Sequence, residues 1–409
     1  MIIGAGQAGG RVAESLRKHG FAGSIALIGD EHARPYERPS LSKEMLLDLE
    51  AEKITWLHDE AFYAAQSVEL ELGAPAATID REKSRVVLRD GTTRDYGVLI
   101  LATGARVREL EVPGAAERCF YLRSIEHSRA LRSAITPQSR LVVIGAGFIG
   151  LEVAAAARAR GAQVTVVETA SCPLSRVAPP PLQDYVRSLH AAHGVEFRFD
   201  ATVERIENCD GGHRVIMTGG EAIEGDIVVV GVGAVPNVEL AAEAGLPCGR
   251  GILVDTTGAT ADPCIFAIGD VAEQEMPLLG RHVLLESWQN AQDGAIALGA
   301  FLARGDASAP EPALPWFWSD QYDRNIQIYG LVDAELSWIE RGSRDEGPWI
   351  LVGVRDGRII YAAGVNAGRD LRALREIIKL GAAVDVATLS DPGNSLMSLL
   401  KTARLANAA

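Results

Sequence analysis

The sequence contains few cysteines, and no two of them lie close together. In 409 residues there are five, without a C-x-x-C or any other short spacing. They are Cys119, Cys172, Cys209, Cys248 and Cys264. Zinc sites and redox-active disulfides usually require closely spaced cysteines. We therefore expect five reduced, structural thiols, as is typical of a cytosolic protein, and no metal site.

Positive charge is also scarce. The 40 Lys and Arg residues are outnumbered by 54 Asp and Glu residues, which gives a net charge of −14. Nucleic acids and anionic membranes are bound through clustered Lys and Arg, so we expect neither as a partner.

Long apolar runs are missing as well. The most apolar stretch, 141–157, contains three glycines and Glu152. It is shorter than the roughly 20 residues that span a bilayer. No signal peptide precedes the first glycine-rich turn, so we expect a soluble, cytoplasmic protein. The length, with 47% hydrophobic and 23% charged residues, is that of a globular protein of two or three domains.

Glycine, by contrast, is concentrated in two turns of the form G-x-G-x-x-G. Each turn follows an apolar strand and opens a helix, and a second apolar strand (24–31 or 163–168) completes a βαβ unit. The glycines are Gly4, Gly6 and Gly9 in the first turn and Gly145, Gly147 and Gly150 in the second. They allow a tight turn, close approach of backbone N–H groups to a pyrophosphate, and close helix–strand packing. Two complete copies predict two dinucleotide sites rather than a chance repeat.

The first βαβ unit begins with very little chain before its glycine turn. Only Met1, Ile2 and Ile3 precede Gly4. The sequence therefore leaves open whether a few residues of the first strand are missing.

The strand ends indicate which dinucleotide each turn binds. Glu168 lies 23 residues after Gly145. A carboxylate there accepts hydrogen bonds from the ribose hydroxyls and repels a 2′-phosphate. The second turn is therefore predicted to bind NADH in preference to NADPH, the alternative being that Glu168 is a solvated strand end. At the first turn, Asp30 is the corresponding candidate and Glu31 the second choice.

Two later segments complete the pattern of a flavin domain. Residues 96–105 form a buried strand that ends in a turn at Thr103 and Gly104, where a ligand can pass at close range. Residues 259–272 form a strand that ends at Gly269 and Asp270. We expect Asp270 to accept hydrogen bonds from a ribityl chain and this turn to open a helix that faces a phosphate. The order of these segments after the glycine turns favours FAD.

The motifs GAGQAG, RPSLSK, ATGA, GAGFIGLE, IFAIGD and PWFWSDQYD occur in an order that resembles the oxygenase-coupled ferredoxin reductases. The resemblance extends over essentially the whole chain. It implies an α/β fold with two Rossmann-like domains, for FAD and NAD, and an α+β C-terminal domain. It also implies electron transfer from NADH through FAD to a two-iron two-sulfur ferredoxin, plant-type or Rieske-type. That ferredoxin would feed a terminal oxygenase, either an aromatic-ring dioxygenase or a haem monooxygenase.

The segment 35–45, PYERPSLSKEM, separates this group from disulfide reductases. Related reductases carry a redox cysteine pair here, and related oxidases and peroxidases carry one cysteine. This chain instead has Ser40, Leu41, Ser42 and Lys43. Because there is no thiol to receive electrons from the flavin, the electrons must pass to another redox protein or to oxygen. An NADH oxidase or peroxidase is therefore the alternative; a non-enzymatic FAD-binding factor is disfavoured by the negative charge.

The resemblance also implies the residues that act. Lys43 matches a lysine near flavin N5 that is paired with a glutamate, here Glu152. A fixed ammonium group favours the reduced, anionic flavin. The structural alternatives are a solvated lysine and a carboxylate placed by the helix dipole. Trp316 and Trp318 are expected on one face of a strand, with one beside the isoalloxazine where ferredoxin docks, or both at a hydrophobic junction.

The remaining cofactor contacts follow from the same resemblance. The FAD candidates are Gly4, Gly6, Ala8, Gly9, Asp30, Arg38, Lys43, Ala76, Thr103, Gly104, Arg123, Asp270 and Trp288. The NAD candidates are Gly145, Gly147, Phe148, Ile149, Gly150, Glu168, Arg176 and Gly233. Arg176 is the weakest of these, because a surface arginine is an equally good interpretation.

We expect three domains. The FAD domain comprises 1–108 and 235–308, the NAD domain 109–234, and the C-terminal domain 309–409, which begins with a proline-rich linker at 309–315. The C-terminal domain is expected to have strands at 326–332 and 349–365, the second with an Asp-Gly hairpin turn, and a helix from about 370. His190 and His193 are expected to be polar helix-end residues rather than metal ligands. A homodimer is possible.

Overall fold

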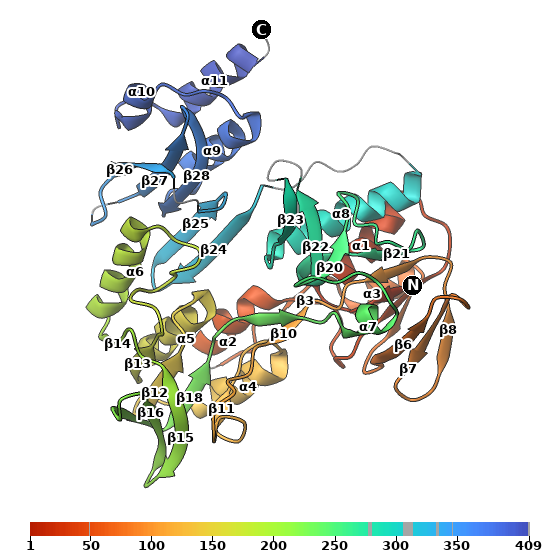
Figure 1. The fold of residues 1–409 in the computed structure, drawn as a ribbon, viewed down its shortest axis with the longest axis horizontal. Helices are drawn as coiled ribbons and strands as arrows, with labels where there is room; N and C mark the ends of the chain where they lie inside the picture. The colour runs from red at the N-terminus through yellow and green to blue at the C-terminus, as the bar shows by residue number, and fades with distance from the viewer. Residues whose placement is uncertain (49, 277–279, 306–313, 333–334, 346, 408–409) are drawn as a thin grey trace. The chain divides into compact units, whose positions relative to one another are not determined.

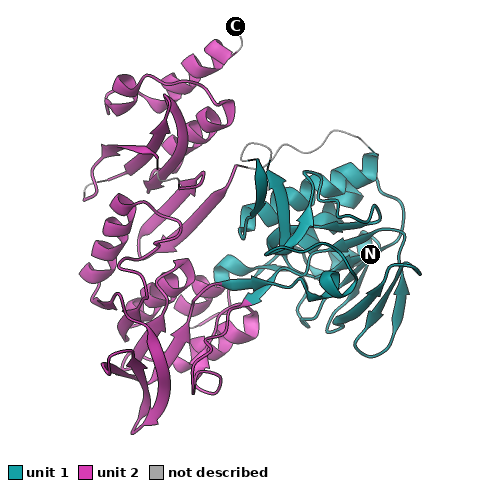
Figure 2. Ribbon diagram, in the orientation of Figure 1, with its two compact units in different colours: residues 1–40, 54–106, 234–313 teal, residues 41–53, 107–233, 314–409 magenta. Residues whose placement is uncertain are grey.

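The structure is a computed structural model of the chain. It describes residues 1–409 apart from 49, 277–279, 306–313, 333–334, 346 and 408–409 (Figure 1). The chain divides into two compact units, coloured separately in Figure 2. Unit 1 comprises Met1–Ser40, Ile54–Arg106 and Ala234–Ala313, and unit 2 comprises Leu41–Lys53, Val107–Gly233 and Leu314–Ala409.

Unit 1 is built on a five-stranded parallel sheet in the order β21-β9-β1-β2-β5. The strands are β1 (Ile2–Ile3), β2 (Ile25–Ile28), β5 (Val68–Glu71), β9 (Leu99–Leu101) and β21 (Ile265–Ala267). Successive side chains point to opposite faces. Ile2 and Leu27 pack with helices α1 (Gln7–Lys18) and α8 (Trp288–Arg304), whereas Ile3 and Ile28 belong to the core on the other face. The apolar strands of a parallel sheet are thus buried on both sides.

The remaining smaller elements belong wholly or mostly to unit 1. They are β3 (Tyr36–Glu37), η1 (Arg38–Ser42), β4 (Thr55–Trp56), α3 (Glu60–Ala65), β6 (Ala76–Asp80), β7 (Arg85–Leu88), β8 (Thr93–Asp95), β10 (Ala105–Val107), β19 (Ala234–Pro236), α7 (Glu239–Glu243), β20 (Ile252–Val254), η2 (Gly269–Val271), β22 (Ala272–Met276) and β23 (Arg281–Leu284). Of these, η1 and β10 end in residues of unit 2. The three-stranded sheet β6-β7-β8, which the sequence did not predict, covers one face of the central sheet with Ile79, Val86 and Leu88.

Unit 2 contains a second parallel sheet in the order β11-β18-β12-β13-β14. Its strands are β11 (Cys119–Phe120), β12 (Arg140–Ile144), β13 (Gln163–Val167), β14 (Val195–Arg198) and β18 (Ile227–Val230). Its helices are α2 (Glu44–Leu47), α4 (Ile125–Ala134), α5 (Phe148–Ala159) and α6 (Pro180–Ala192). An antiparallel sheet of β15 (Val203–Cys209), β16 (Gly212–Met217) and β17 (Ala222–Gly225) packs its apolar residues against the parallel sheet.

The C-terminal part of unit 2 is an antiparallel sheet in the order β24-β25-β28-β27-β26. Its strands are β24 (Trp316–Gln321), β25 (Arg324–Tyr329), β26 (Ser337–Gly342), β27 (Trp349–Arg355) and β28 (Arg358–Val365), followed by α9 (Gly368–Leu380), α10 (Val386–Ser390) and α11 (Leu396–Asn407). The predicted hairpin is confirmed, since Asp356 and Gly357 have φ of +51° and +71°. Positive φ at both positions suits a tight turn between twisted strands. The helix expected from about 370 begins at 368.

Two expectations from the sequence concern the turn at 269–270 and the linker at 309–315. The turn at Gly269 and Asp270 does not open a helix: η2 is one short 3₁₀ turn, and the chain continues directly into β22. The expectation is wrong because 272–276 pairs with both β20 and β23. Most of the predicted linker at 309–315 lies outside the described residues.

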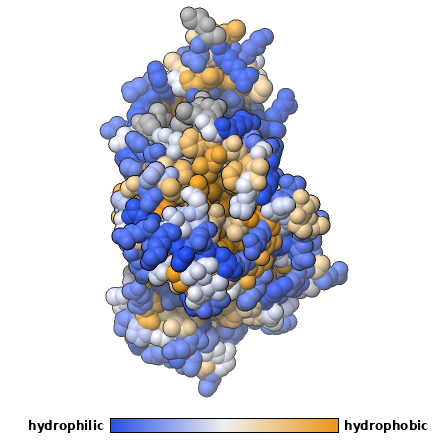
Figure 3. All heavy atoms as spheres, turned by 90° about the vertical axis from the view of Figure 1, so that its right-hand side faces the viewer, coloured by the Kyte–Doolittle hydropathy of each residue, from blue (hydrophilic) through white to orange (hydrophobic). Residues whose placement is uncertain are grey.

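The two compact units do not test the expected three-domain division, which remains a proposal. Leu41–Lys53 groups with unit 2, whereas the flanking segments belong to unit 1. No helix among the described residues combines the length and the apolarity that crossing a membrane requires. The face drawn in Figure 3 is mostly hydrophilic, with an apolar area near its middle.

Candidate active site

The first glycine turn joins β1 to α1 in unit 1. Gly4 has a φ of +108°, and a Cβ on it would lie 2.1 Å from the carbonyl oxygen of Ala102. A Cβ on Gly9 would lie 1.9 Å from the oxygen of Gly4. Gly6 has a different surrounding: a Cβ there would meet only the Arg38 guanidinium, at 3.9 Å. The turn is therefore closely packed on its inner side and open at Gly6, the N-cap of α1.

The second glycine turn repeats this geometry in unit 2. Gly145 has a φ of +105°, and its Cβ would lie 2.4 Å from the oxygen of Gly231. A Cβ on Gly150 would lie 2.1 Å from the oxygen of Gly145, while one on Gly147 would have no atom within 4 Å. No side chain caps the start of α5 at Gly147. Backbone N–H groups at a helix start that has no side-chain cap can bind a pyrophosphate. Both glycine turns therefore have the geometry that a dinucleotide site requires.

Carboxylates lie at the strand ends beside both turns. Glu168 follows β13, and its Oε2 accepts a hydrogen bond from the Ala146 N–H at 2.7 Å. Its Oε1 accepts from the Ala170 N–H at 2.9 Å. The carboxylate is thereby fixed against the glycine turn, and its oxygens have further lone pairs for ribose hydroxyls.

In unit 1, the structure distinguishes Asp30 from Glu31. Glu31 accepts hydrogen bonds from Tyr36 and Arg38, both at 2.6 Å. Asp30 is exposed and accepts from the Glu31 N–H, so it is the more accessible carboxylate. Burial opposes the charge of Arg38, but Tyr36, Glu31 and Asp270 outweigh it and raise the pKa of Arg38. The Asp270 carboxylate thus stabilises the charge of Arg38, and both residues are FAD candidates.

The turn at Thr103 and Gly104 is held by a residue that the sequence analysis did not single out. Asn237 donates its amide to the Thr103 carbonyl at 2.8 Å, and Thr103 Oγ1 donates to the Asn237 carbonyl at 3.0 Å. The Asn237 N–H also bonds Gly104 O at 2.9 Å. The available signal was its position, four residues after the NAD candidate Gly233 at the end of the stretch VVVGVGAVPN.

The other cofactor candidates are divided between the two units. Ala8 lies against Gly269, where a Cβ would be 3.0 Å from the Ala8 methyl. Ala76 begins β6 and Trp288 begins α8, both in unit 1, while Arg123 and Lys43 belong to unit 2. At the second turn, Phe148 and Ile149 begin α5, and Ile149 is 45% exposed. Arg176 and Gly233 are neighbours, with the guanidinium 3.9 Å from a Cβ on Gly233.

Lys43 and Glu152 form a buried ion pair in unit 2, with Nζ 3.0 Å from Oε1. Glu152 is 3% exposed and Lys43 9%. Ser42 Oγ donates to Oε2, and Ser319 Oγ donates to Oε1 at 2.7 Å. Burial raises the pKa of Glu152, and the Lys43 ammonium and the two hydroxyls oppose that rise. Lys43 is buried, so it is not the solvated lysine of the structural alternative. Glu152 lies beyond the first turn of α5, which contains no acidic residue, so the helix dipole does not account for its position.

The two tryptophans of β24 lie on one face of the strand, as predicted. The ring centroids of Trp316 and Trp318 are 4.9 Å apart with planes at 18°, and Trp316 also stacks on Tyr329. Trp318 has its ring centroid 5.9 Å from Lys43 Nζ, at cation–π distance. Trp316 instead packs against the core under the C-terminal sheet. Packing therefore explains Trp316, and Trp318 is the tryptophan beside the ion pair.

The Lys43 segment is anchored to α4 and α5, which the sequence did not reveal. Ser128 Oγ on α4 donates to the Leu41 carbonyl at 2.8 Å, and both residues are buried. Arg132 donates to the Asp48 carbonyl at 2.7 Å, and Arg160 to that of Leu46 at 3.2 Å. These bonds tie the Lys43 segment to α4 and to the C-terminal end of α5, the helix that carries Glu152.

We expect Ser128→Ala to lower the free energy of unfolding by about 1–3 kcal/mol, because the Leu41 carbonyl would be left buried without its donor. Ser133→Ala, at an exposed position of the same helix, should change it by less than about 0.5 kcal/mol. Denaturant unfolding of both variants measures the difference. Equal values for the two would show that the Ser128 bond anchors nothing.

The two histidines at the end of α6 differ in their exposure to solvent. His193 is the exposed C-cap of the helix, but His190 is fully buried, with Nε2 2.8 Å from Gln321 Oε1. Burial lowers the pKa of His190 to about 4. His190 lies in the last turn of α6, as expected, but it is buried, because α6 turns this position inward toward β24 and Phe197.

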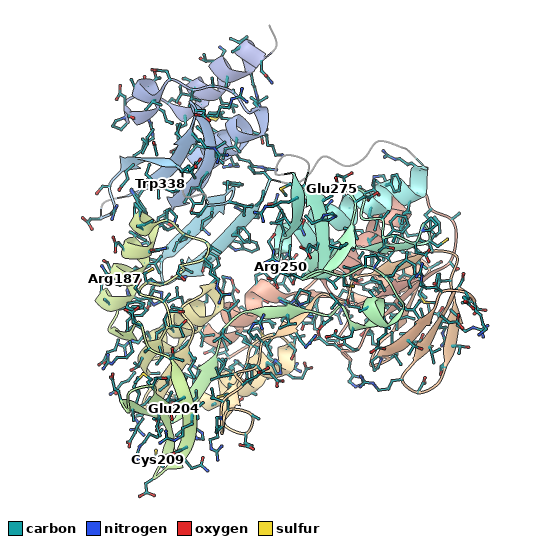
Figure 4. The ribbon with its side chains drawn as sticks, viewed as in Figure 1. Arg187, Glu204, Cys209, Arg250, Glu275 and Trp338 are labelled. Atoms are coloured by element: carbon teal, nitrogen blue, oxygen red, sulfur yellow. The ribbon has the colours of Figure 1, made fainter. Side chains whose placement is uncertain are left out.

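All five cysteines are free. Cys209 ends β15 and lies at the tip of the β15–β16 hairpin, on a strand that also carries Glu204 (Figure 4). Across the described part of the chain, no three His, Cys, Asp or Glu side chains are grouped as metal ligands.

Comparison with known proteins agrees with this geometry. The sequence profile of the family described as pyridine nucleotide-disulphide oxidoreductase matches residues 1–295, and that described as reductase C-terminal matches residues 316–400. The chain is 44% identical over 403 residues to the anthranilate 1,2-dioxygenase system ferredoxin–NAD(+) reductase component of Burkholderia cepacia, covering 98% of each chain.

Solved structures show the same fold. The ferredoxin reductase for the CYP199A2 system from Rhodopseudomonas palustris is 40% identical, with a TM-score of 0.93. Putidaredoxin reductase, in its covalent complex with putidaredoxin, is 35% identical, also with a TM-score of 0.93. Each match covers 98% of both chains. The fold class predicted from the sequence is confirmed, and the chain belongs to the pyridine nucleotide-disulphide oxidoreductase family, in the group that carries the reductase C-terminal domain.

Proposed function

We propose that the protein is an FAD-dependent NADH–ferredoxin reductase that delivers electrons to an oxygenase system. The observation that carries this proposal is the buried Lys43–Glu152 pair, which stands next to Ser42 where related disulfide reductases have a redox thiol. The named relatives, all ferredoxin reductases over nearly their full length, support it. FAD, when bound, accepts a hydride as an electron pair and releases electrons singly.

The residues around the two turns suit this role. NAD is assigned to the second turn, where Glu168 would accept the adenosine ribose hydroxyls and disfavour a 2′-phosphate. FAD is assigned to the first turn, with Asp30 toward its ribose and with Arg38 and Asp270 nearby. Lys43 would hold a fixed positive charge against the negative charge that arrives with the hydride, and Glu152 would orient Lys43.

The proposed partner is a two-iron two-sulfur ferredoxin. The resemblance of the motifs favours a two-iron two-sulfur cluster in the ferredoxin, and the five free cysteines favour a cytoplasmic location. A direct test is to mix the NADH-reduced protein anaerobically with an oxidised two-iron ferredoxin and follow bleaching of the ferredoxin. Transfer within seconds would support the proposal, and an unchanged ferredoxin spectrum would contradict it.

Trp318 is the proposed route toward ferredoxin. We expect Trp318→Ala to slow ferredoxin reduction about 10-fold more than it slows flavin reduction by NADH. The resemblance implies that one tryptophan of β24 lies where ferredoxin docks, and Trp318 is the one beside Lys43. Trp316→Ala is the control and should mainly lower stability, by about 3 kcal/mol. Stopped-flow traces of the two half-reactions give the ratio. Equal slowing of both in Trp318→Ala would reduce Trp318 to a packing role.

A further inference from the structure

Behind the Lys43–Glu152 pair, a line of buried polar side chains continues through unit 2 to α6. Ser319 Oγ lies 2.7 Å from Glu152 Oε1. Gln321 Nε2 lies 3.0 Å from Ser319 Oγ, and His190 Nε2 lies 2.8 Å from Gln321 Oε1. Ser319, Gln321 and His190 are each 0% exposed. Buried polar groups are costly unless satisfied, and here each satisfies the next.

The hydrogen atoms of this chain can be assigned, and all point toward Glu152. An ionised carboxylate only accepts, so Ser319 donates its O–H to Glu152. Ser319 Oγ then accepts from the Gln321 amide, which turns the amide oxygen toward His190. His190 Nε2 must therefore carry a proton, and Nδ1 is left to accept from the Tyr322 hydroxyl at 3.3 Å.

This polarity favours negative charge on Glu152. Each donor places the positive end of its dipole toward the carboxylate, and hydrogen bonds in a chain polarise one another. The neutral form of His190 keeps the direction fixed, since its pKa is lowered to about 4 by burial and it stays uncharged near neutral pH. Gln321 has no titratable proton, so the chain acts through polarity and position rather than by passing protons.

We propose that His190, Gln321 and Ser319 are positioning residues that keep the Glu152 carboxylate ionised and aligned with Lys43. The inference rests on the proposed role of the Lys43–Glu152 pair. The other groups that face Glu152 are the Lys43 ammonium and the Ser42 hydroxyl. At the far end, Tyr322 and His193 face His190. No contact of the chain with NADH or ferredoxin is needed for this effect.

The test measures Glu152 directly, by infrared spectroscopy of the oxidised holoenzyme as a function of pH. The carboxylic-acid C=O band of Glu152 is assigned by its absence in Glu152→Gln. Ser319→Ala removes the hydroxyl that donates to Glu152 Oε1 without adding a second carboxyl group. We expect the band to appear at a pH about one unit higher than in the unmodified protein, which is the effect of losing one hydrogen bond to a charged group.

Two further variants keep the proposal testable if Ser319→Ala does not fold. His190→Phe keeps a ring in place but removes the terminal donor, and it should shift the band in the same direction by a smaller amount. His193→Phe, at the exposed end of the same helix, keeps the stacking on Tyr322 and should leave the band unchanged. If the band in Ser319→Ala and His190→Phe appears at the same pH as in the unmodified protein, the proposal is overturned.

Nitrogen NMR of the unmodified protein adds an independent readout, because the chain requires His190 to carry its proton on Nε2. A proton on Nδ1 instead would overturn the assignment. The rate of flavin reduction by NADH against pH separates this inference from the proposed function. A shifted band with a matching shift of the rate profile supports both. A shifted band with an unchanged rate profile supports the chain and overturns the role of Glu152 in flavin reduction.

Discussion

Lys43→Met is expected to slow flavin reduction by NADH about 100-fold or more while FAD stays bound. Methionine has a similar length and packs in the same space, but it removes the ammonium group 3.0 Å from Glu152. The buried carboxylate would then lose the partner that opposes its protonation. Anaerobic stopped-flow spectroscopy measures the rate as bleaching of the flavin.

A matched control is available on the same segment. Lys53 is 58% exposed on its side chain and pairs with Asp48 at the surface. Lys53→Met removes the same charge from the same segment and should leave the rate unchanged. If Lys43→Met bleaches at the normal rate, the ion pair is structural and the catalytic assignment fails.

Glu168→Gln is expected to lower the preference for NADH over NADPH by about 10- to 100-fold in kcat/KM, the value of one or two hydrogen bonds to a charged group. The amide is nearly the same size and can still accept from the Ala146 N–H through its oxygen. It no longer repels a 2′-phosphate, so NADPH should gain as NADH loses. Steady-state kinetics with both nucleotides gives the ratio.

Glu196→Gln serves as the control, since Glu196 is an exposed carboxylate on the neighbouring strand β14. It changes the net charge equally but lies away from the strand end, and it should leave the nucleotide preference as it was. An unchanged preference in Glu168→Gln would mean that another residue selects the nucleotide.

The sequence predicted the cofactor turns because their information is local. Gly4 and Gly145 require positive φ, and Gly9 and Gly150 require the absence of a Cβ, within a stretch of six residues each. The same holds for the Asp356-Gly357 hairpin. The Lys43–Glu152 pair was reached only through the family resemblance, since its partners lie more than 100 positions apart.

What the sequence missed depends on contacts between distant segments. Ser128 meets the Leu41 carbonyl across 87 positions, and His190 meets Gln321 across 131. Nothing in the sequence of α6 distinguishes a buried His190 from the exposed His193 three residues later. The turn at Gly269 does not begin a helix as predicted, because 272–276 pairs with two strands close in the sequence, β20 and β23.

The most direct test of the central claim is NADH consumption by the purified holoenzyme with and without a two-iron ferredoxin, with peroxide measured in the same samples. The account predicts slow consumption by the reductase alone, a large increase with ferredoxin, and little peroxide. Rapid consumption with oxygen alone, unchanged by ferredoxin, would contradict it and make the protein an oxidase.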